Sequence, residues 1–219
     1  MKQLFILAFT IFFITGFATP ADINPGIDRW KIKTSLKTNA EHKTSTLKKL
    51  LALANPFTDA DNITCQDSKY DTERFKKEVS GFKEGDIVTV KGWIHLVALE
   101  NDSKYHRDGD YHIQMRTSKQ WGDTCFIVEI PMGEFASNES LKNKFEASRK
   151  FVRDRLLKGN EPGTNGNKMQ HEVYVTVTGQ LFFDLIHSCG NPRGKKGMKS
   201  YSCWELHPVT DIAFAIKPH

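Results

Sequence analysis

Long apolar runs are scarce in this chain of 219 residues. The one such run spans residues 4–17 (LFILAFTIFFITGF), follows the positive Lys2, and is followed by small residues. It is shorter than the roughly 20 residues that cross a hydrocarbon core, and its flanks are typical of a secretory signal peptide. We therefore predict that residues 1–21 form a signal peptide, and that the mature chain is secreted or periplasmic with no transmembrane segment. A retained N-terminal anchor is the alternative.

Several motifs that carry chemistry are also missing. The chain has no Cys-x-x-Cys pair, no Gly-x-Ser-x-Gly sequence and no glycine-rich loop between a strand and a helix. Their absence argues against a cysteine-based zinc site, a serine nucleophile and a nucleotide cofactor. The formal net charge of +5 is a mild excess, far from that of a dedicated nucleic-acid binder.

Cysteine is rare, but its even number is informative. The four cysteines, Cys65, Cys125, Cys189 and Cys203, all lie beyond the predicted signal peptide. Because an exported protein meets an oxidising compartment, they favour disulfides. Four cysteines allow three pairings, of which we prefer Cys189–Cys203 with Cys65–Cys125, since the first pair flanks one connection. Free buried thiols are the alternative.

The hydrophobic pattern divides the mature chain into an arm and a domain. Residues 22–80 are polar and basic, with one amphipathic stretch at 45–54 that predicts a short helix ended by Asn55-Pro56. We expect this arm to pack loosely, with Trp30 and Ile32 pinning an extended segment to the surface. Residues 81–219 then carry the regular strand pattern of a single domain.

The order of elements in that domain predicts an OB-like β-barrel. Alternating apolar residues predict strands at 87–97, 111–116, 125–130, 173–178, 181–186 and 203–216, with a bulge or sharp bend near Gly92. Residues 137–158 predict the single long helix, since Leu141, Phe145, Val152 and Leu156 recur at helical spacing. A mainly β fold with a bent first strand and a helix after the third strand is the layout of an OB-fold.

Titratable residues recur on the polar face of several predicted strands. In strands, residues at i and i+2 share a face, so His112 lies opposite Tyr111 and Ile113, while Glu205 and His207 lie opposite Trp204 and Leu206. Asp184 stands between bulky apolar residues, and His187 follows at the strand end. Barrel closure could therefore bring together His112, Asp184, His187, Glu205 and His207.

Two imidazoles and two carboxylates suit a divalent metal such as zinc or manganese, or a general acid–base pair. The plainer interpretation is a solvated polar face with no chemistry, because a half-exposed antiparallel sheet always has one. The sequence therefore favours a binding module with an unidentified ligand. The first alternative is a metal-assisted hydrolase, for example of phosphodiesters, with His112, His207 and His187 as candidate ligands and Glu205 or Asp184 as ligand or base. A purely structural envelope protein is another alternative.

Nucleic-acid binding is a further alternative. OB-type barrels bind single strands through aromatic rings and a basic groove. Trp93 and Trp204 are candidate stacking residues, and Lys195 and Lys196 lie in a basic predicted loop at 190–200. Aromatic residues of a barrel are more often part of its core, and a Gly/Lys loop is more often simply solvated.

Six segments, taken together and in order, resemble a widespread group of uncharacterised secreted bacterial proteins. They are RWKIKT (29–34), GWIHLV (92–97), DGDYHI (108–113), VEIP (128–131), TGQLFFD (178–184) with His187, and WELHPV (204–209). The resemblance implies an exported bacterial domain with a small β-barrel. It also implies that His112, Asp184, His187, Glu205 and His207 are the residues to test, without assigning them roles.

Overall fold

The computed structural model describes residues 29–100, 109–118, 124–190 and 192–218, with the side chain of Cys189 excepted. The predicted signal peptide, residues 1–21, lies outside them. Among the described residues, no helix has the length and apolar character needed to cross a membrane.

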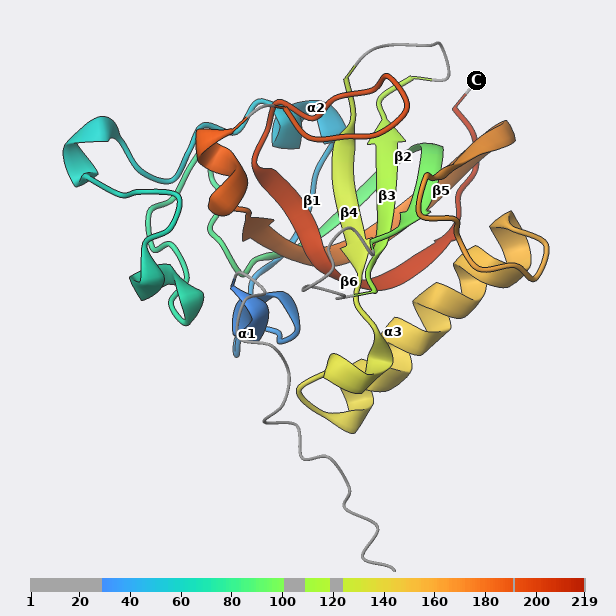
Figure 1. Cartoon of the computed structure of the whole chain (residues 1–219), viewed down its shortest axis with the longest axis horizontal. Helices are drawn as coiled ribbons and strands as arrows, with labels where there is room; N and C mark the ends of the chain where they lie inside the picture. The colour runs from blue at the N-terminus through green and yellow to red at the C-terminus, as the bar shows by residue number, and fades with distance from the viewer. Residues whose placement is uncertain (1–28, 101–108, 119–123, 191, 219) are drawn as a thin grey trace, which may run out of the picture.

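Five strands close into a β-barrel (Figure 1). Around the barrel the order is β2-β3-β4-β6-β5, and β5 pairs again with β2. The pairing of β4 with β6 is parallel, and the other pairings of the closed barrel are antiparallel. The strands are β2 (Ile87–Leu99), β3 (Tyr111–Arg116), β4 (Phe126–Ile130), β5 (Asn167–Phe183) and β6 (Trp204–Phe214). The predicted mainly β, OB-like barrel is confirmed.

Strand alternation decides which side chains fill the barrel. Tyr111, Ile113 and Met115 of β3 point inward with Val128 of β4 and Leu206 of β6, and all are fully buried in one hydrophobic cluster. The intervening residues of each strand therefore face outward. The outward face of β3, β4 and the first part of β6, up to Val209, is also buried, because other parts of the chain lie over it.

The bulge in β2 is not at the predicted position. The register with both neighbouring strands shifts between Ile94 and Leu96, which leaves His95 as the extra residue. Gly92 has regular pairing instead, and its role is spatial. A Cβ atom there would lie 2.4 Å from Cδ1 of Leu47. The missing side chain lets the arm approach the strand.

The long helix forms where the apolar spacing predicts it. Helix α3 (Glu139–Phe151) begins at Asn138, whose side chain accepts a hydrogen bond from the Leu141 amide, and continues as a π-helical turn, Val152–Leu156. It lies along one end of the barrel and packs mainly against β6 (Figure 1). Leu141, Phe145 and Val152 contribute its apolar stripe to the core.

The predicted strands at 173–178 and 181–186 are one strand, β5, with register shifts on both sides of Gly179. A Cβ atom at Gly179 would lie 2.9 Å from the Pro208 carbonyl oxygen, so glycine permits the close approach of β6. A 3₁₀ turn, Ile186–Cys189, follows β5. Further 3₁₀ turns span Asp59–Asp61, Ser68–Asp71 and Gly133–Phe135.

The N-terminal arm packs tightly, contrary to the prediction. Trp30–Lys33 form a helical turn, α1, rather than an extended segment, and β1 (His42–Thr44) adds to β2 as a parallel strand. Helix α2 (Leu47–Leu51) lies within the predicted stretch and buries Leu47 and Leu50 in the core cluster. These leucines make the arm part of the hydrophobic core, and Leu47 packs against β2 beside Gly92.

A buried ion pair fixes the start of the arm. The Arg29 guanidinium lies 2.7 Å from Glu84, and it also donates to the carbonyl oxygens of Tyr70, Glu73 and Phe183. Glu84 in turn accepts hydrogen bonds from the backbone amides of Phe75 and Phe183. We call Arg29, Glu84 and these backbone groups the Arg29 clamp. It joins the arm to the end of β5.

The cysteine prediction is partly wrong. Within the described residues, Cys125 is a free and fully buried thiol, so the predicted Cys65–Cys125 disulfide does not form. Its place just before β4 turns its side chain into the protein, where burial raises the thiol pKa to about 12. Cys203 is half-buried. The Cys189–Cys203 bridge stays a prediction, since the side chain of Cys189 lies outside the description.

Candidate functional site

Three titratable side chains form a row across the outward face of the barrel. His112 of β3 stands directly opposite Glu129 of β4 in the strand register. On the other side of β4, Ile127 and Val128 pair with Glu205 and Leu206 of β6, which brings His207 beside Glu129. The row His112–Glu129–His207 follows from barrel closure, since β4 and β6 are far apart in the sequence.

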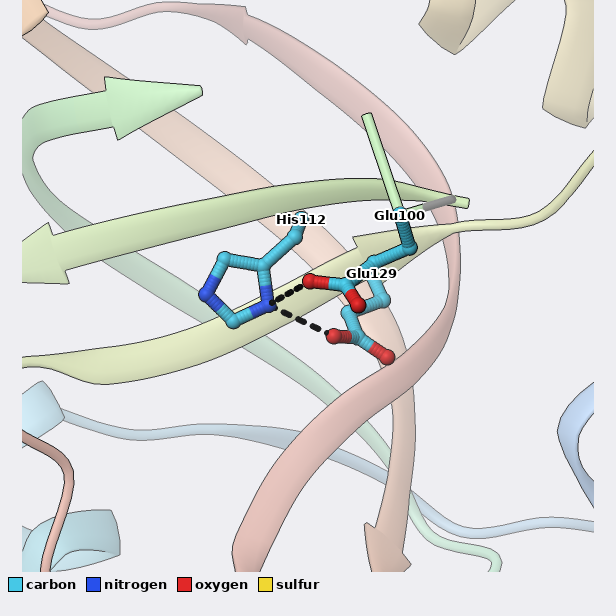
Figure 2. A group of neighbouring side chains, drawn as sticks. All are labelled: Glu100, His112 and Glu129. Atoms are coloured by element: carbon cyan, nitrogen blue, oxygen red, sulfur yellow. Dashed lines mark hydrogen bonds and ion pairs between the residues drawn. The ribbon is translucent and has the colours of Figure 1, made fainter. Parts of the chain in front are cut away.

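His112 is held by two glutamates at the edge of a cavity (Figure 2). Its Nδ1 atom lies 2.8 Å from Oε1 of Glu129 and 3.3 Å from Oε1 of Glu100 at the end of β2. The other ring nitrogen, Nε2, is buried and has no hydrogen-bond partner among the described residues. Both carboxylates therefore meet one nitrogen of the ring.

His207 is fully buried among three carboxylates. Its Nδ1 atom lies 3.0 Å from Oε2 of Glu129 and 3.2 Å from Oε1 of Glu205. Its Nε2 atom lies 3.2 Å from Oδ2 of Asp110, which directly precedes β3. Glu129 thus presents one oxygen to each histidine.

The carboxylates set the pKa values of these groups. Burial lowers the pKa of His207, but the charge of Asp110 and the hydrogen bonds of three carboxylates outweigh it and hold the pKa well above 6.5. For His112, burial also acts downward, and Glu129 and Glu100 reverse it, so its pKa is raised. Burial raises the pKa of Glu129, yet its hydrogen bonds to both histidines bring the pKa well below the usual value.

A second group of charges adjoins this row. Arg193 places Nη1 2.7 Å from Asp184 and 2.5 Å from Glu205, and Asp184 also contacts Nδ1 of His187 at 2.8 Å. Burial raises the pKa of Asp184, but the Arg193 charge and the His187 hydrogen bond lower it further than burial raises it. Because Arg193 touches both carboxylates, it links the end of β5 to β6.

The connection between β5 and β6 covers the outward face. Backbone groups of Lys195 exchange hydrogen bonds with the Gln114 side chain, and the Lys199 carbonyl accepts from the Cys125 amide. The cover leaves a cavity of about 420 Å³ open beside His112. The cavity is lined by Lys33, Glu100, His112, Glu129, Asp184, His187, Pro192, Arg193, Gly194 and Lys195, and we call its cationic residues and His187 the cationic wall.

The structure brings together most of the predicted site residues. His112, His207 and Glu205 lie in one network, and Asp184 and His187 join it through Arg193. The predicted stacking residues do not belong to it. Trp93 and Trp204 are buried in the interior, so their rings are not available to bases, and Lys196 is exposed but does not line the cavity.

Sequence reasoning missed Glu129, Glu100 and Asp110 as site residues. Glu129 had a usable signal, because a single carboxylate stands among apolar residues in the fully buried strand β4. Glu100 and Asp110 follow and precede strands, where polar residues are ordinary. Only their positions beside His112 and His207 distinguish them from solvated surface groups.

Two groups of side chains have the spacing of a metal site. The ligand atoms of Glu100, His112 and Glu129 lie within 4.8 Å of one another, as do those of Asp110, Glu129 and His207. Imidazole and carboxylate donors suit zinc and manganese. Three protein ligands with a cavity beside them match a catalytic metal site, which keeps one position for water or substrate.

Neither a search with protein-family models nor a search of curated proteins found a match to this chain. The resemblance to secreted bacterial proteins remains a prediction.

Proposed function

We propose that this protein is a metal-dependent hydrolase that holds one zinc or manganese ion between Glu100, His112 and Glu129 and acts on a phosphoester. The observation that carries the proposal is the meeting of two glutamate oxygens at one ring nitrogen of His112, on the wall of a cavity. The proposal adopts the metal-assisted alternative predicted from the sequence, but with Glu129 and Glu100 as the carboxylate ligands.

Ligand spacing supports this assignment. Around a tetrahedral ion with bonds of about 2.1 Å, neighbouring ligand atoms are roughly 3.4 Å apart. The distances from His112 Nδ1 to Glu100 and Glu129 are 3.3 and 2.8 Å. The His112–Glu129 distance would have to lengthen by about 0.6 Å to reach that spacing, and the three ligand atoms all lie within 4.8 Å of one another.

The choice of a phosphoester rests on the cationic residues that line the same cavity. Arg193, Lys195, Lys33 and His187 line it together with the acidic triad. Cationic side chains and a divalent ion in one cavity suit an anionic substrate, and Arg in particular suits phosphate oxygens. A divalent ion supplies Lewis-acid polarisation of a phosphoryl oxygen and lowers the pKa of a bound water to about 7.

The neighbouring groups hold this arrangement. Glu129 is fixed by His207 at 3.0 Å, and Lys195 places Nζ 3.4 Å from Glu100. Arg193 is held by Asp184 and Glu205, so in this proposal those two carboxylates orient the cationic wall and do not bind the ion. The roles assigned to Asp184 and Glu205 thus differ from those predicted from the sequence.

The proposal is tested with full-chain protein purified without a metal-affinity tag. We expect at least one tightly bound Zn²⁺ or Mn²⁺ per chain by elemental analysis, and hydrolysis of bis(p-nitrophenyl) phosphate that stops on chelation and returns with Mn²⁺. The substitution His112→Gln should remove both metal and hydrolysis.

His171→Gln is the matched control, because His171 lies on β5 with an exposed side chain and outside the cavity. Protein that binds no metal, or a His112→Gln variant that binds it as tightly as the parent, would contradict the proposal. Fluorescence titration with a single-stranded oligonucleotide in the absence of metal separates it from the nucleic-acid alternative. Tight metal-independent binding there would favour that alternative.

A further inference from the structure

The two metal-like triads share a single residue, Glu129, and they use its two oxygens differently. Oε1 lies 2.8 Å from Nδ1 of His112, and Oε2 lies 3.0 Å from Nδ1 of His207. The two histidines come from β3 and β6, which pair with opposite sides of β4. Glu129 therefore stands between two sets of ligands.

We propose that the site holds two divalent ions, and that Glu129 bridges them. The inference rests on the proposed function, to which it adds a second ion held by Asp110, Glu129 and His207. Two carboxylate oxygens that each bind one ion keep the ions about 3.5–4 Å apart, which is the separation found in two-metal phosphatases and nucleases.

The geometry of the second triad supports an ion there. The ligand atoms of Asp110, Glu129 and His207 lie within 4.8 Å of one another, and Asp110 Oδ2 is 3.2 Å from the His207 ring. Asp110 lies at Nε2 of His207 and Glu129 at Nδ1, so the imidazole would have to turn for one ring nitrogen to join an oxygen from each carboxylate. Glu205 contacts Nδ1 of His207 and pairs with Arg193, so it would orient the histidine and not bind the ion.

Burial gives a second, independent reason. Asp110, Glu205 and His207 are fully buried, and Glu129 is 8% exposed. Carboxylates are costly to bring out of water unless positive charge accompanies them. Arg193 already pairs with Glu205, so Asp110 and Glu129 are the buried carboxylates that a second divalent ion would neutralise and coordinate.

Glu100, His112 and Glu129 line the cavity, whereas Asp110 and His207 do not. A substrate in the cavity would therefore meet the ion at His112, and the second ion would act on it through the shared Glu129.

The test uses Mn²⁺ alone, added to the metal-stripped full chain and followed by elemental analysis and low-temperature electron paramagnetic resonance. We expect two Mn²⁺ per chain and the spectrum of an exchange-coupled pair. The substitution Asp110→Asn should reduce the stoichiometry to one and replace the coupled signal with that of an isolated ion. Glu139→Gln, on the exposed start of α3, is the matched control and should bind two ions.

One uncoupled Mn²⁺ per chain in the parent protein would overturn the second ion while leaving the proposed function intact. No bound Mn²⁺ here, together with no Zn²⁺ or Mn²⁺ in the protein as purified, would overturn both proposals and leave His207 as a hydrogen-bonding centre. Because the decisive measurement is made on the parent chain, the result stands even if Asp110→Asn fails to fold. A thermal melt of the variant shows whether it folds.

Discussion

The barrel carries two buried clusters of charged side chains, and the two clusters differ in how their charges are paired. In the Arg29 clamp, one cation meets one carboxylate, and the remaining guanidinium hydrogens go to backbone carbonyls. In the site, several carboxylates surround two histidines, and Nε2 of His112 has no hydrogen-bond partner in the described part of the chain. Cavities open beside both clusters: His112 and Glu129 of the site line one of about 420 Å³, and Glu84 of the clamp lines one of about 390 Å³.

The difference separates a structural role from a functional one. A buried ion pair is tolerated when every group has a partner, because leaving one charge unpaired costs far more than the pair gains. The site leaves Nε2 of His112 buried with no hydrogen-bond partner among the described residues, and so departs from that rule. Departures of this kind concentrate at functional sites. We therefore expect substitutions in the clamp to change the free energy of unfolding, and substitutions in the site to change metal binding.

The largest expected effect is on the clamp. Arg29→Met leaves Glu84 buried without its cation, so we expect the free energy of unfolding to fall by about 3–5 kcal/mol. Urea unfolding measures it, with the exposed Lys31→Met as control. Metal bound per folded chain should not change. A loss below about 1 kcal/mol would mean that the clamp is not structural.

The reverse pattern is expected in the site. Glu100→Gln removes one of several carboxylates at a half-exposed position, so the free energy of unfolding should change by less than about 0.5 kcal/mol. The dissociation constant for Mn²⁺ should rise by about 10–100-fold. Isothermal titration calorimetry measures the affinity. A variant that unfolds more easily but binds Mn²⁺ as before would reverse the comparison.

A smaller effect is expected on the cationic wall. Lys195→Met removes a positive charge that lines the cavity, so KM for a phosphodiester should rise by roughly 5-fold while kcat is nearly constant. Steady-state kinetics at two salt concentrations measure it. The neighbouring Lys196 does not line the cavity, and Lys196→Met should leave KM unchanged. A fall in kcat alone would place Lys195 in the chemical step.

The smallest effect concerns a buried histidine outside the site. Burial lowers the pKa of His95 to about 4, assisted by the charges of Arg116 and Lys168, whereas the carboxylates of the site raise the pKa of His112. His95 takes up a proton more readily when unfolded, so its contribution to stability is present above pH 6.5 and is lost as the pH falls toward 4. An NMR titration measures the pKa of His95. In the His95→Gln variant, the free energy of unfolding should fall less between pH 6.5 and pH 4 than in the parent protein. An ordinary pKa for His95 would remove the contrast.

Much of the barrel could be predicted because strands of period two carry their own signal. The alternation at Tyr111–Met115 and Val173–Val177 identified strands and their inward faces, and the helical spacing from Leu141 to Val152 identified α3. The glycines were harder to interpret. Gly92 matched the pattern of a bulge, but its role depends on Leu47, which lies far away in the sequence.

The site was predictable only as a set of candidates. Period two assigned His112, Glu205 and His207 to outward faces, and the structure confirms those faces. It could not identify Glu129 as the residue between the histidines, since pairing of β4 with both β3 and β6 depends on closure of the barrel. Nor could it indicate that Arg193, from a polar loop, would meet Asp184 and Glu205.

By itself, the sequence determined the strands, the long helix, and which strand residues face outward, because these follow from local periodicity. The tertiary structure alone decided that the outward face is buried, that Glu129 joins two histidines, and that the arm completes the core. Those features arise from contacts between segments distant in the chain. No local pattern encodes such contacts, because which segments meet depends on how all the strands pair at once.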